Sequence, residues 1–203
     1  MLINSLPLSR IYFIVLVCTT ELFLVGCAGL GQDQFDVQEY LDGTTGSTIT
    51  AANQTMILYS EEPLLAANTR DYISVGPVEI NKVGNRTYFL WIGIWTTIDR
   101  PGLSDKTLRQ QFDPIVFFVD GEPMEFSFVS RAGIEQAPYS FSAPGAVEGY
   151  YATTRSQIER LAAAADLRIR VSMNESPAKI YRLWSRNTNS FSDFSGFLGD
   201  VEN

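Results

Sequence analysis

The sequence has 203 residues, a formal net charge of −8 and no histidine. The acidic balance excludes a nucleic-acid binder that works by charge, because affinity for phosphate needs a basic surface. The absence of histidine removes the commonest metal ligand and general base, and with it any Ser-His or Cys-His catalytic pair. We therefore expect no metal, no bound cofactor and no nucleic-acid partner.

The chain begins with the pattern of a secretory signal peptide. Ten residues that contain one basic side chain, Arg10, precede the apolar run IYFIVLVC at 11–18. That run is too short to span a bilayer core, which needs about 20 residues. A charged start, a short apolar stretch and small residues before a cleavage point are typical of a segment that is removed on export. We assign residues 1–26 to it.

The end of this segment carries a more specific motif, Leu24-Val25-Gly26-Cys27. It resembles the lipobox of bacterial lipoprotein precursors, in which the Cys becomes the first residue of the mature protein. The resemblance implies that the sulfur of Cys27 takes a diacylglycerol and that the new amine is acylated in turn, with fatty acids such as palmitate. Two or three chains anchor stably, since each buried methylene contributes about 0.8 kcal/mol and one chain binds only marginally.

The alternative is a transmembrane anchor that runs to about Leu30. Glu21 disfavours this alternative, because a carboxylate deep in hydrocarbon is costly. In the lipoproteins that the motif resembles, the residue after the Cys influences which membrane is chosen, and an Asp there retains many of them on the inner membrane. Ala28 follows here, so the resemblance implies the periplasmic face of the outer membrane, with the inner membrane as second choice.

Both cysteines of the chain are used by this processing. Cys18 leaves with the signal peptide and Cys27 takes the lipid, so the mature domain has no thiol and no disulfide. Its chain is long enough to bury roughly two thirds of its unfolded surface without such a cross-link. The domain therefore depends on its apolar core, although its compartment favours disulfides.

The mature chain divides into a tether, a folded domain and a tail. Residues 27–47 are rich in glycine and polar side chains, which predicts a flexible tether with a short ordered piece around 35–41. Residues 48–190 form the predicted β-domain, and residues 191–203 a short C-terminal tail. Runs rich in Val, Ile, Phe, Tyr, Trp and Thr predict strands. These lie at 56–61, 72–81, 86–99, 114–119, 124–129, 149–154, 167–173 and 179–184, with a further edge at 48–50.

Alternation along these runs predicts the fold class. In 167–173 the apolar residues alternate with Arg168, Arg170 and Ser172, and Met124, Phe126 and Phe128 alternate with polar residues in the same way. Strands with one wet face favour an antiparallel sheet over a parallel one. We predict an antiparallel β-sandwich, immunoglobulin-like as first choice and a small barrel as second.

Three local patterns complete the fold prediction. Val83-Gly84-Asn85 and Asp120-Gly121 carry residues that tolerate positive φ and predict tight hairpin turns. Ser156 with Glu159 forms a capping box and predicts one helix over 156–165, with Ile158, Leu161, Ala162 and Ala165 on one face. In the tail, Phe191, Phe194, Phe197 and Leu198 have near-helical spacing, which predicts docking onto the domain or, as the alternative, a free segment for a partner groove.

The strand at 86–99 is apolar on both faces. Phe89, Trp91 and Trp95 share one face and flank Gly93. One interpretation is a central strand that is covered on both sides, since aromatic residues in strands mostly serve packing. The other is an exposed aromatic binding strip formed by Phe89, Trp91 and Trp95, which would hold an envelope protein or a glycan.

The catalytic motifs are scarce. A group of acids, Asp99, Asp113, Asp120, Glu122 and Glu125, falls near strand ends. A glycosidase needs two such carboxylates across a cleft, which the sequence does not reveal. Calcium loops, nucleophile elbows and phosphate-binding glycine loops have no counterpart in the sequence. We expect no catalytic residues, and keep a periplasmic hydrolase that uses carboxylates or a lone Ser or Tyr as the alternative.

Parts of the mature chain carry a second resemblance. The segments Tyr40-Leu41-Asp42, Thr48-Ile49-Thr50, Asp71-Tyr72-Ile73 and Val75-Gly76-Pro77-Val78-Glu79 resemble uncharacterised proteobacterial lipoproteins, which implies no activity. The sequence therefore predicts a membrane-anchored, periplasm-facing lipoprotein with a non-enzymatic binding or envelope-assembly role. A carrier of an apolar ligand is a further alternative.

Overall fold

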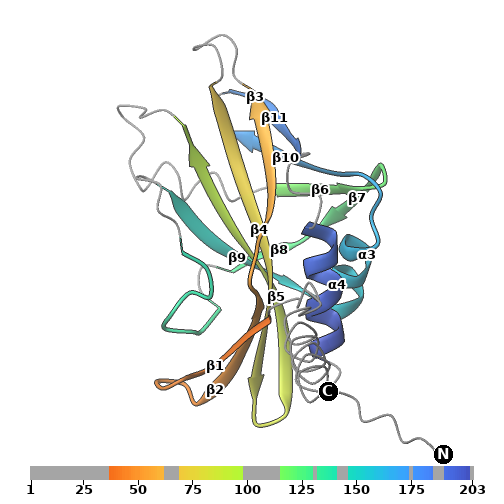
Figure 1. Ribbon diagram of the computed structural model, residues 1–203. Helices are drawn as coiled ribbons and strands as arrows, with labels where there is room; N and C mark the ends of the chain where they lie inside the picture. The colour runs from red at the N-terminus through yellow and green to blue at the C-terminus, as the bar shows by residue number, and fades with distance from the viewer. Residues whose placement is uncertain are drawn as a thin grey trace, which may run out of the picture. The chain divides into compact units, whose positions relative to one another are not determined.

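The computed structural model describes residues 37–61, 69–97, 115–129, 132–140, 146–173, 176–184 and 190–201, all within the unit Phe35–Asn203. Eleven strands in this part of the chain form one antiparallel sheet (Figure 1). The strands are β1 Val37–Asp42, β2 Ser47–Ala52, β3 Met56–Glu61, β4 Arg70–Lys82, β5 Asn85–Thr96, β6 Ile115–Val119, β7 Glu122–Glu125, β8 Ser127–Val129, β9 Val147–Thr153, β10 Leu167–Met173 and β11 Ser176–Leu183. The helices are α3 Arg155–Ala162 and α4 Ser190–Asp200.

Nine of the strands form a nearly closed barrel. Their order around the sheet is β7-β6-β10-β11-β3-β4-β5-β9-β8. The two end strands are neighbours in sequence, separated only by Phe126, so the segment from Glu122 to Val129 pairs with β6 through its first half and with β9 through its second. The mainly antiparallel fold and its barrel alternative are confirmed.

The immunoglobulin-like sandwich is corrected by this topology. A sandwich needs two separate sheets, whereas the strand pairing here is continuous from β7 to β8. Its strands have the one-sided alternation that both folds share, because a barrel also has one face inside and one outside. The predicted helix count is also corrected, since two helices lie in the described part of the chain.

The long hairpin β4–β5 is the backbone of the barrel, and a two-residue turn closes it. Lys82 pairs with Asn85, so Val83 and Gly84 form the loop, with φ angles of 52° and 82°. The turn at Asp120-Gly121 is of the same kind, with φ angles of 52° and 88°. Two residues with positive φ match the twist of the flanking strands, so both turn predictions are confirmed.

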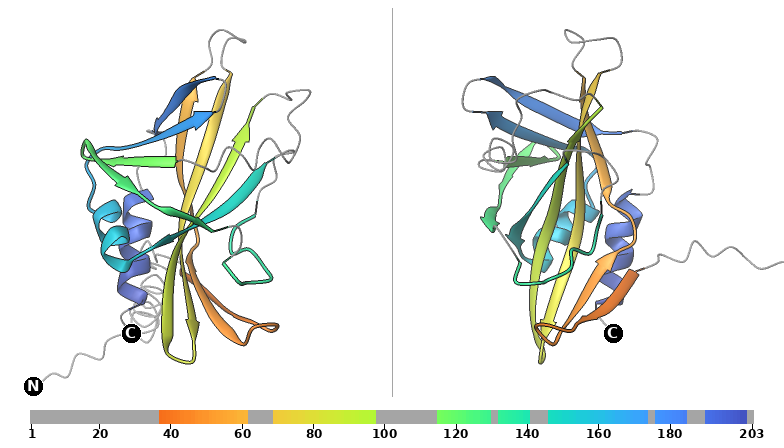
Figure 2. Two further views of the ribbon diagram at one scale, coloured as in Figure 1. Left: turned by 180° about the vertical axis from the view of Figure 1, so that it is seen from behind. Right: turned by 90° about the vertical axis from the view of Figure 1, so that its left-hand side faces the viewer.

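The β1–β2 hairpin lies beside the barrel and includes the C-terminal part of the predicted tether. β4 pairs with β3 through its first half and with β2 through its second. Figure 2 shows this hairpin alongside the lower half of β4 and β5. β1 falls inside the range 27–47 that we expected to be flexible, at the position of the short ordered piece. Its charged and glycine-rich surroundings hid a strand that gains its stability from pairing with β2.

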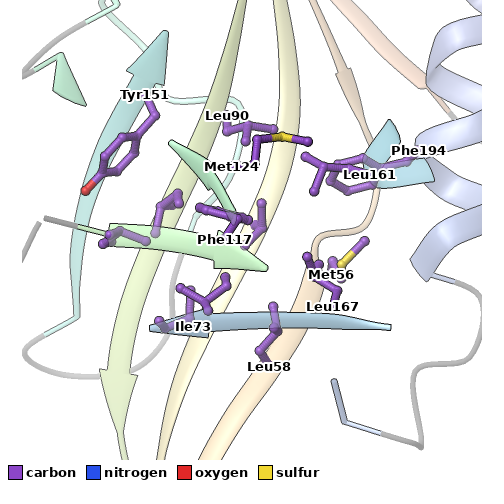
Figure 3. Packing of buried hydrophobic residues seen from close by; sticks show 14 of the residues in the cluster. Met56, Leu58, Ile73, Leu90, Phe117, Met124, Tyr151, Leu161, Leu167 and Phe194 are labelled. Atoms are coloured by element: carbon purple, nitrogen blue, oxygen red, sulfur yellow. The ribbon is translucent and has the colours of Figure 1, made fainter. Parts of the chain in front are cut away.

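The interior of the barrel is filled by large apolar side chains (Figure 3). Leu90, Ile92 and Ile94 of β5 point inward, as do Leu167, Ile169 and Val171 of β10, while Arg168 and Arg170 are exposed. The wet, basic face predicted for β10 is therefore confirmed. Met124 is buried as predicted, whereas Phe128 is 39% exposed and packs with its ring edge against Tyr151.

The two helices pack against the core and correct the details of the prediction. The cap of α3 is Thr154 with Gln157, two residues before the predicted Ser156 and Glu159. Thr and Gln form the same reciprocal hydrogen bonds as Ser and Glu, so the sequence holds two overlapping boxes. Ile158 and Leu161 are buried as predicted, but Ala164 takes the place expected for Ala165.

The C-terminal tail belongs to the folded domain. Its helix, α4, starts at Ser190, and Phe194 and Phe197 are both fully buried in the main core. The docked tail is confirmed, and the free docking segment is wrong. A helix with two buried rings cannot leave the barrel without exposing apolar surface.

Candidate binding surface

The three residues of the predicted strip do not share one exposed surface. Trp91 is 1% exposed and belongs to a second apolar cluster on the outer face of the sheet, while Phe89 and Trp95 are half-buried. The indole N–H of Trp91 donates to Glu148 Oε2 over 3.1 Å. The packing interpretation therefore holds for Trp91.

The segment 132–140 covers Trp91. The ring of Tyr139 lies 4.9 Å from that of Trp91, and its hydroxyl donates to the carbonyl of Pro77 over 2.9 Å. The same ring rests on Gly76, where an added Cβ would lie 2.4 Å from Tyr139 Cζ. A glycine is thus required at this point of β4, because any side chain would displace the tyrosine that covers the tryptophan.

Hydrogen bonds to the β1–β2 hairpin hold this covering segment in place. Gln38 Nε2 donates to the carbonyl of Pro138 over 2.8 Å, and the hydroxyl of Tyr40 donates to that of Gln136 over 2.9 Å. The backbone N–H of Glu135 donates to Asp42 Oδ2 over 3.1 Å, and this bond holds the pKa of Asp42 below its usual range. The β1–β2 hairpin, which the sequence indicated only as an ordered piece at 35–41 and an edge at 48–50, is what keeps the outer cluster closed.

A small pocket of about 310 Å³ remains between the covering segment and the sheet. Its lining is mostly polar, and its volume is at the lower limit for a small-molecule site. It is lined by Gln38, Asn53, Thr55, Trp91, Pro138, Tyr139 and Ser140.

The strand register builds a different surface on the outer face of the barrel. Six side chains lie directly opposite one another, one on each of six adjacent strands. We call this set the arginine–aromatic row: Phe118, Arg168, Arg182, Tyr59, Tyr72 and Trp95 of β6, β10, β11, β3, β4 and β5.

The rings at one end of the row are packed against one another. Trp95 stacks on Tyr72 of β4, with ring centroids 4.1 Å apart and an angle of 11° between the ring planes. The ring of Trp184 lies 5.4 Å from that of Tyr72 on a tilted plane. Tyr72 is buried, whereas Trp95, Trp184 and Tyr59 remain half-buried. Stacked and fixed in this way, the rings form a rigid platform that loses little entropy when a ligand covers it.

Arginines lie around these rings. The guanidinium of Arg70 lies 5.3 Å from the ring of Tyr59, and that of Arg170 lies 5.2 Å from the ring of Phe118. Arg168 pairs with Asp166 over 2.5 Å, and Arg70 lies 3.9 Å from Glu61. Within the described part of the chain, Arg170 and Arg182 form no ion pair. An acidic protein thus has a local basic face.

Two further features mark this face. Arg168 and Arg182 are directly opposed across β10 and β11, where like charges destabilise a sheet. Ile180, two residues from Arg182, is 56% exposed.

The alternation of β10 gave a partial signal for this surface in the sequence, because it predicted the exposed arginines. Their alignment with Tyr59 and Trp95 depends on register, which alternation does not determine.

The structure describes three of the five acids that the hydrolase alternative could use. Asp120 Oδ1 accepts the backbone N–H groups of Ala165 and Asp166 over 2.9 and 2.8 Å, which is a structural role. Glu122 and Glu125 are exposed on β7, and Asp99 and Asp113 lie outside the described residues. No group of three or more potential metal ligands occurs among the residues that the structure describes.

One buried acid was missed by the sequence analysis. Glu79 of β4 is 3% exposed, and Oε2 of its carboxylate has no hydrogen-bond partner among the residues that the structure describes. Burial raises its pKa, although the Tyr88 hydroxyl and the nearby Arg86 act in the opposite direction. Arg86 Nε lies 3.7 Å from Glu79 Oε1. The position of Glu79 in an otherwise apolar strand was the signal from which the sequence could have revealed this buried acid.

The predicted lipidation site, Cys27, lies outside the described residues. In the part of the chain that is described, no helix is long and apolar enough to cross a membrane. No family model, curated protein or solved structure matches the chain.

Proposed function

We propose that this protein is a lipid-anchored, non-enzymatic binding domain of the bacterial envelope. Cys27 tethers it to the periplasmic face of the outer membrane, and the arginine–aromatic row holds another envelope component. The lipobox-like Leu24-Val25-Gly26-Cys27 supports the anchor. The observation that carries the binding role is the direct opposition of Arg168 and Arg182 beside half-buried rings.

The composition of the row favours binding over a purely structural role. Arginine, tyrosine and tryptophan are the residues most often responsible for binding energy at interfaces. Arg168 has Asp166 as its ion-pair partner, whereas the opposed Arg182 has none among the described residues, so an anionic partner would supply the counter-charge that Arg182 lacks. The alternatives have less support among the described residues: Glu79, the acid with a raised pKa, is enclosed, and the barrel interior that a carrier would use is filled by the core.

Site-specific photo-crosslinking in intact cells tests the binding role. A benzophenone side chain introduced in place of Ile180 lies on the basic face, and the same side chain in place of Val83 lies at the tip of the β4–β5 hairpin; both positions are exposed. We expect an adduct from position 180 and none from position 83. Adducts from position 83 alone, or from neither position, would contradict the proposal.

Intact-mass measurement of the membrane-extracted protein tests the anchor. We expect the mature chain to start at Cys27 and to carry diacylglycerol and a further acyl group. Cys27→Ala should leave the precursor uncut and without acyl chains. A wild-type protein without added acyl mass would overturn the anchor while leaving the crosslinking result to stand by itself.

A further inference from the structure

We infer that the partner of the arginine–aromatic row is an extended anionic glycan, an inference that rests on the proposed binding function. The geometry of the row is the first reason. It crosses six adjacent strands at about 4.8 Å per strand, and so runs for roughly 24 Å around the outside of the barrel. Figure 1 shows β6 and β10 running almost across the direction of β4 and β5, so the row bends with the sheet.

This curvature selects among classes of anionic partner. A flat bilayer surface touches only a few neighbouring strands of a curved sheet, and would leave either Phe118 or Trp95 without contact. A linear polymer can follow the row over its whole length. Nucleic acid is a linear anion too, but the anchor that we propose holds the domain in the envelope, outside the compartment that contains nucleic acid.

The side chains of the row match the two chemical features of an acidic glycan. The faces of sugar rings are apolar and pack on exposed aromatic rings, and half-buried Trp95, held in place by its stack on Tyr72, presents such a ring. Carboxylate, phosphate or sulfate groups accept paired hydrogen bonds from guanidinium groups, which Arg168, Arg170 and Arg182 present on adjacent strands. A neutral glycan would leave Arg170 and Arg182, which form no ion pair within the described part of the chain, without a counter-charge, so we expect acidic substituents along the ligand.

Binding of defined polymers to the full-length lipidated protein in detergent micelles tests the inference. The probes are polygalacturonate oligomers, which carry one carboxylate per sugar, and neutral dextran of the same length. We expect polygalacturonate to bind and to change the tryptophan fluorescence, and dextran to bind at least about tenfold more weakly. Replacing Trp95 and Trp184 together by Phe should remove most of the fluorescence change, because Trp91, the third tryptophan of the chain, is enclosed.

A matched pair of double variants separates the site from general electrostatics. Arg168→Gln with Arg182→Gln should weaken polygalacturonate binding by about tenfold or more, as expected for the loss of charged hydrogen bonds. Lys82→Gln with Arg160→Gln removes the same charge from exposed positions on β4 and α3, and should change affinity less than about twofold. Equal losses in both variants would overturn the inference.

Other partners give distinguishable results. Binding to vesicles that contain phosphatidylglycerol, or to an acidic peptide, without binding to polygalacturonate would overturn the glycan inference. The proposed function would survive that result if the crosslink from position 180 persisted. Loss of both the polymer binding and the crosslink would overturn the inference and the proposed function together.

Discussion

Two tryptophans on the same face of β5 have different roles because of what lies above them. Trp91 is closed in by Tyr139 and the segment 132–140, whereas Trp95 has a stacking partner but remains half-buried. The sequence shows that the two tryptophans lie on one face of the strand, but alternation gives no sign of which of them is covered. A residue's burial on the outer face is decided by distant segments, which is why the sequence left two interpretations open for the strip.

Truncation of Trp91 and truncation of Trp95 should lower the stability of the domain by different amounts. Trp91→Ala should lower the free energy of unfolding by about 3–5 kcal/mol, as truncation of a buried aromatic does. Trp95→Ala should cost less, about 0.5–1.5 kcal/mol for the lost aromatic pair together with the smaller apolar area that a half-buried ring removes from water. Urea unfolding followed by circular dichroism measures both, with Trp91→Phe as a milder control. Equal losses for Trp91 and Trp95 would show that the segment 132–140 does not protect Trp91.

The burial of Glu79 makes the stability of the domain depend on pH. Its pKa is raised in the folded protein by burial, so the folded state binds this proton more tightly than the unfolded chain. The stability that this proton contributes is complete below the pKa of the unfolded chain, and it is lost as the pH rises through the raised pKa. At neutral pH the charged carboxylate therefore destabilises the domain.

Glu79→Gln should remove this effect. We expect the variant to unfold at a higher urea concentration than the wild type at about pH 7, and the difference to shrink as the pH is lowered toward about pH 4. Glu122→Gln, at an exposed position of β7, is the matched control and should leave the profile unchanged. A variant that is less stable at pH 7 would show that the attraction of Arg86 outweighs the desolvation of the carboxylate.

At the level of elements, the prediction from sequence depended on local patterns. The exact bounds of β3 and β10 follow from their composition and alternation, and both positive-φ turns follow from their residues. β1 was predicted only as a short ordered piece within the tether, because its charged residues and the glycines around it match a tether better than a strand. Barrel and sandwich could not be separated, since strand pairing between distant parts of the chain leaves no mark on the period of a single strand.

Val83 shows that a correct turn need not have the best residue. It has a positive φ and is 97% exposed, so a branched side chain has a conformational cost with no packing in return. Val83→Asn should raise the free energy of unfolding by about 1 kcal/mol. The matching increase in melting temperature is about 2–4 °C. Calorimetry measures it; an unchanged or lower melting temperature, or an equal gain from Val83→Ile, would contradict the strain.

At the level of the whole molecule, the barrel is not equally strong around its circumference. β4 and β5 share twelve residue pairs, whereas β3 and β11 share two, Arg182 with Tyr59 and Leu183 with Leu58. The backbone N–H of Trp184 adds a hydrogen bond to Ile57. Native-state hydrogen exchange should therefore be faster at Leu58 and Leu183 than at Ile92, the centre of β5. Equal protection at these amides would indicate that the barrel opens only as a unit.

The short β3–β11 pairing also bears on how the protein reaches its folded state. The two strands are far apart in the sequence, so closing this seam is a non-local event of the kind that slows β-protein folding. In the export that we propose, the chain emerges from its N-terminus, so β3 keeps an open edge until β11 follows it. During that interval the open edge of β3 is free to pair with another chain, so the unfinished barrel is most exposed to misassociation before this seam closes.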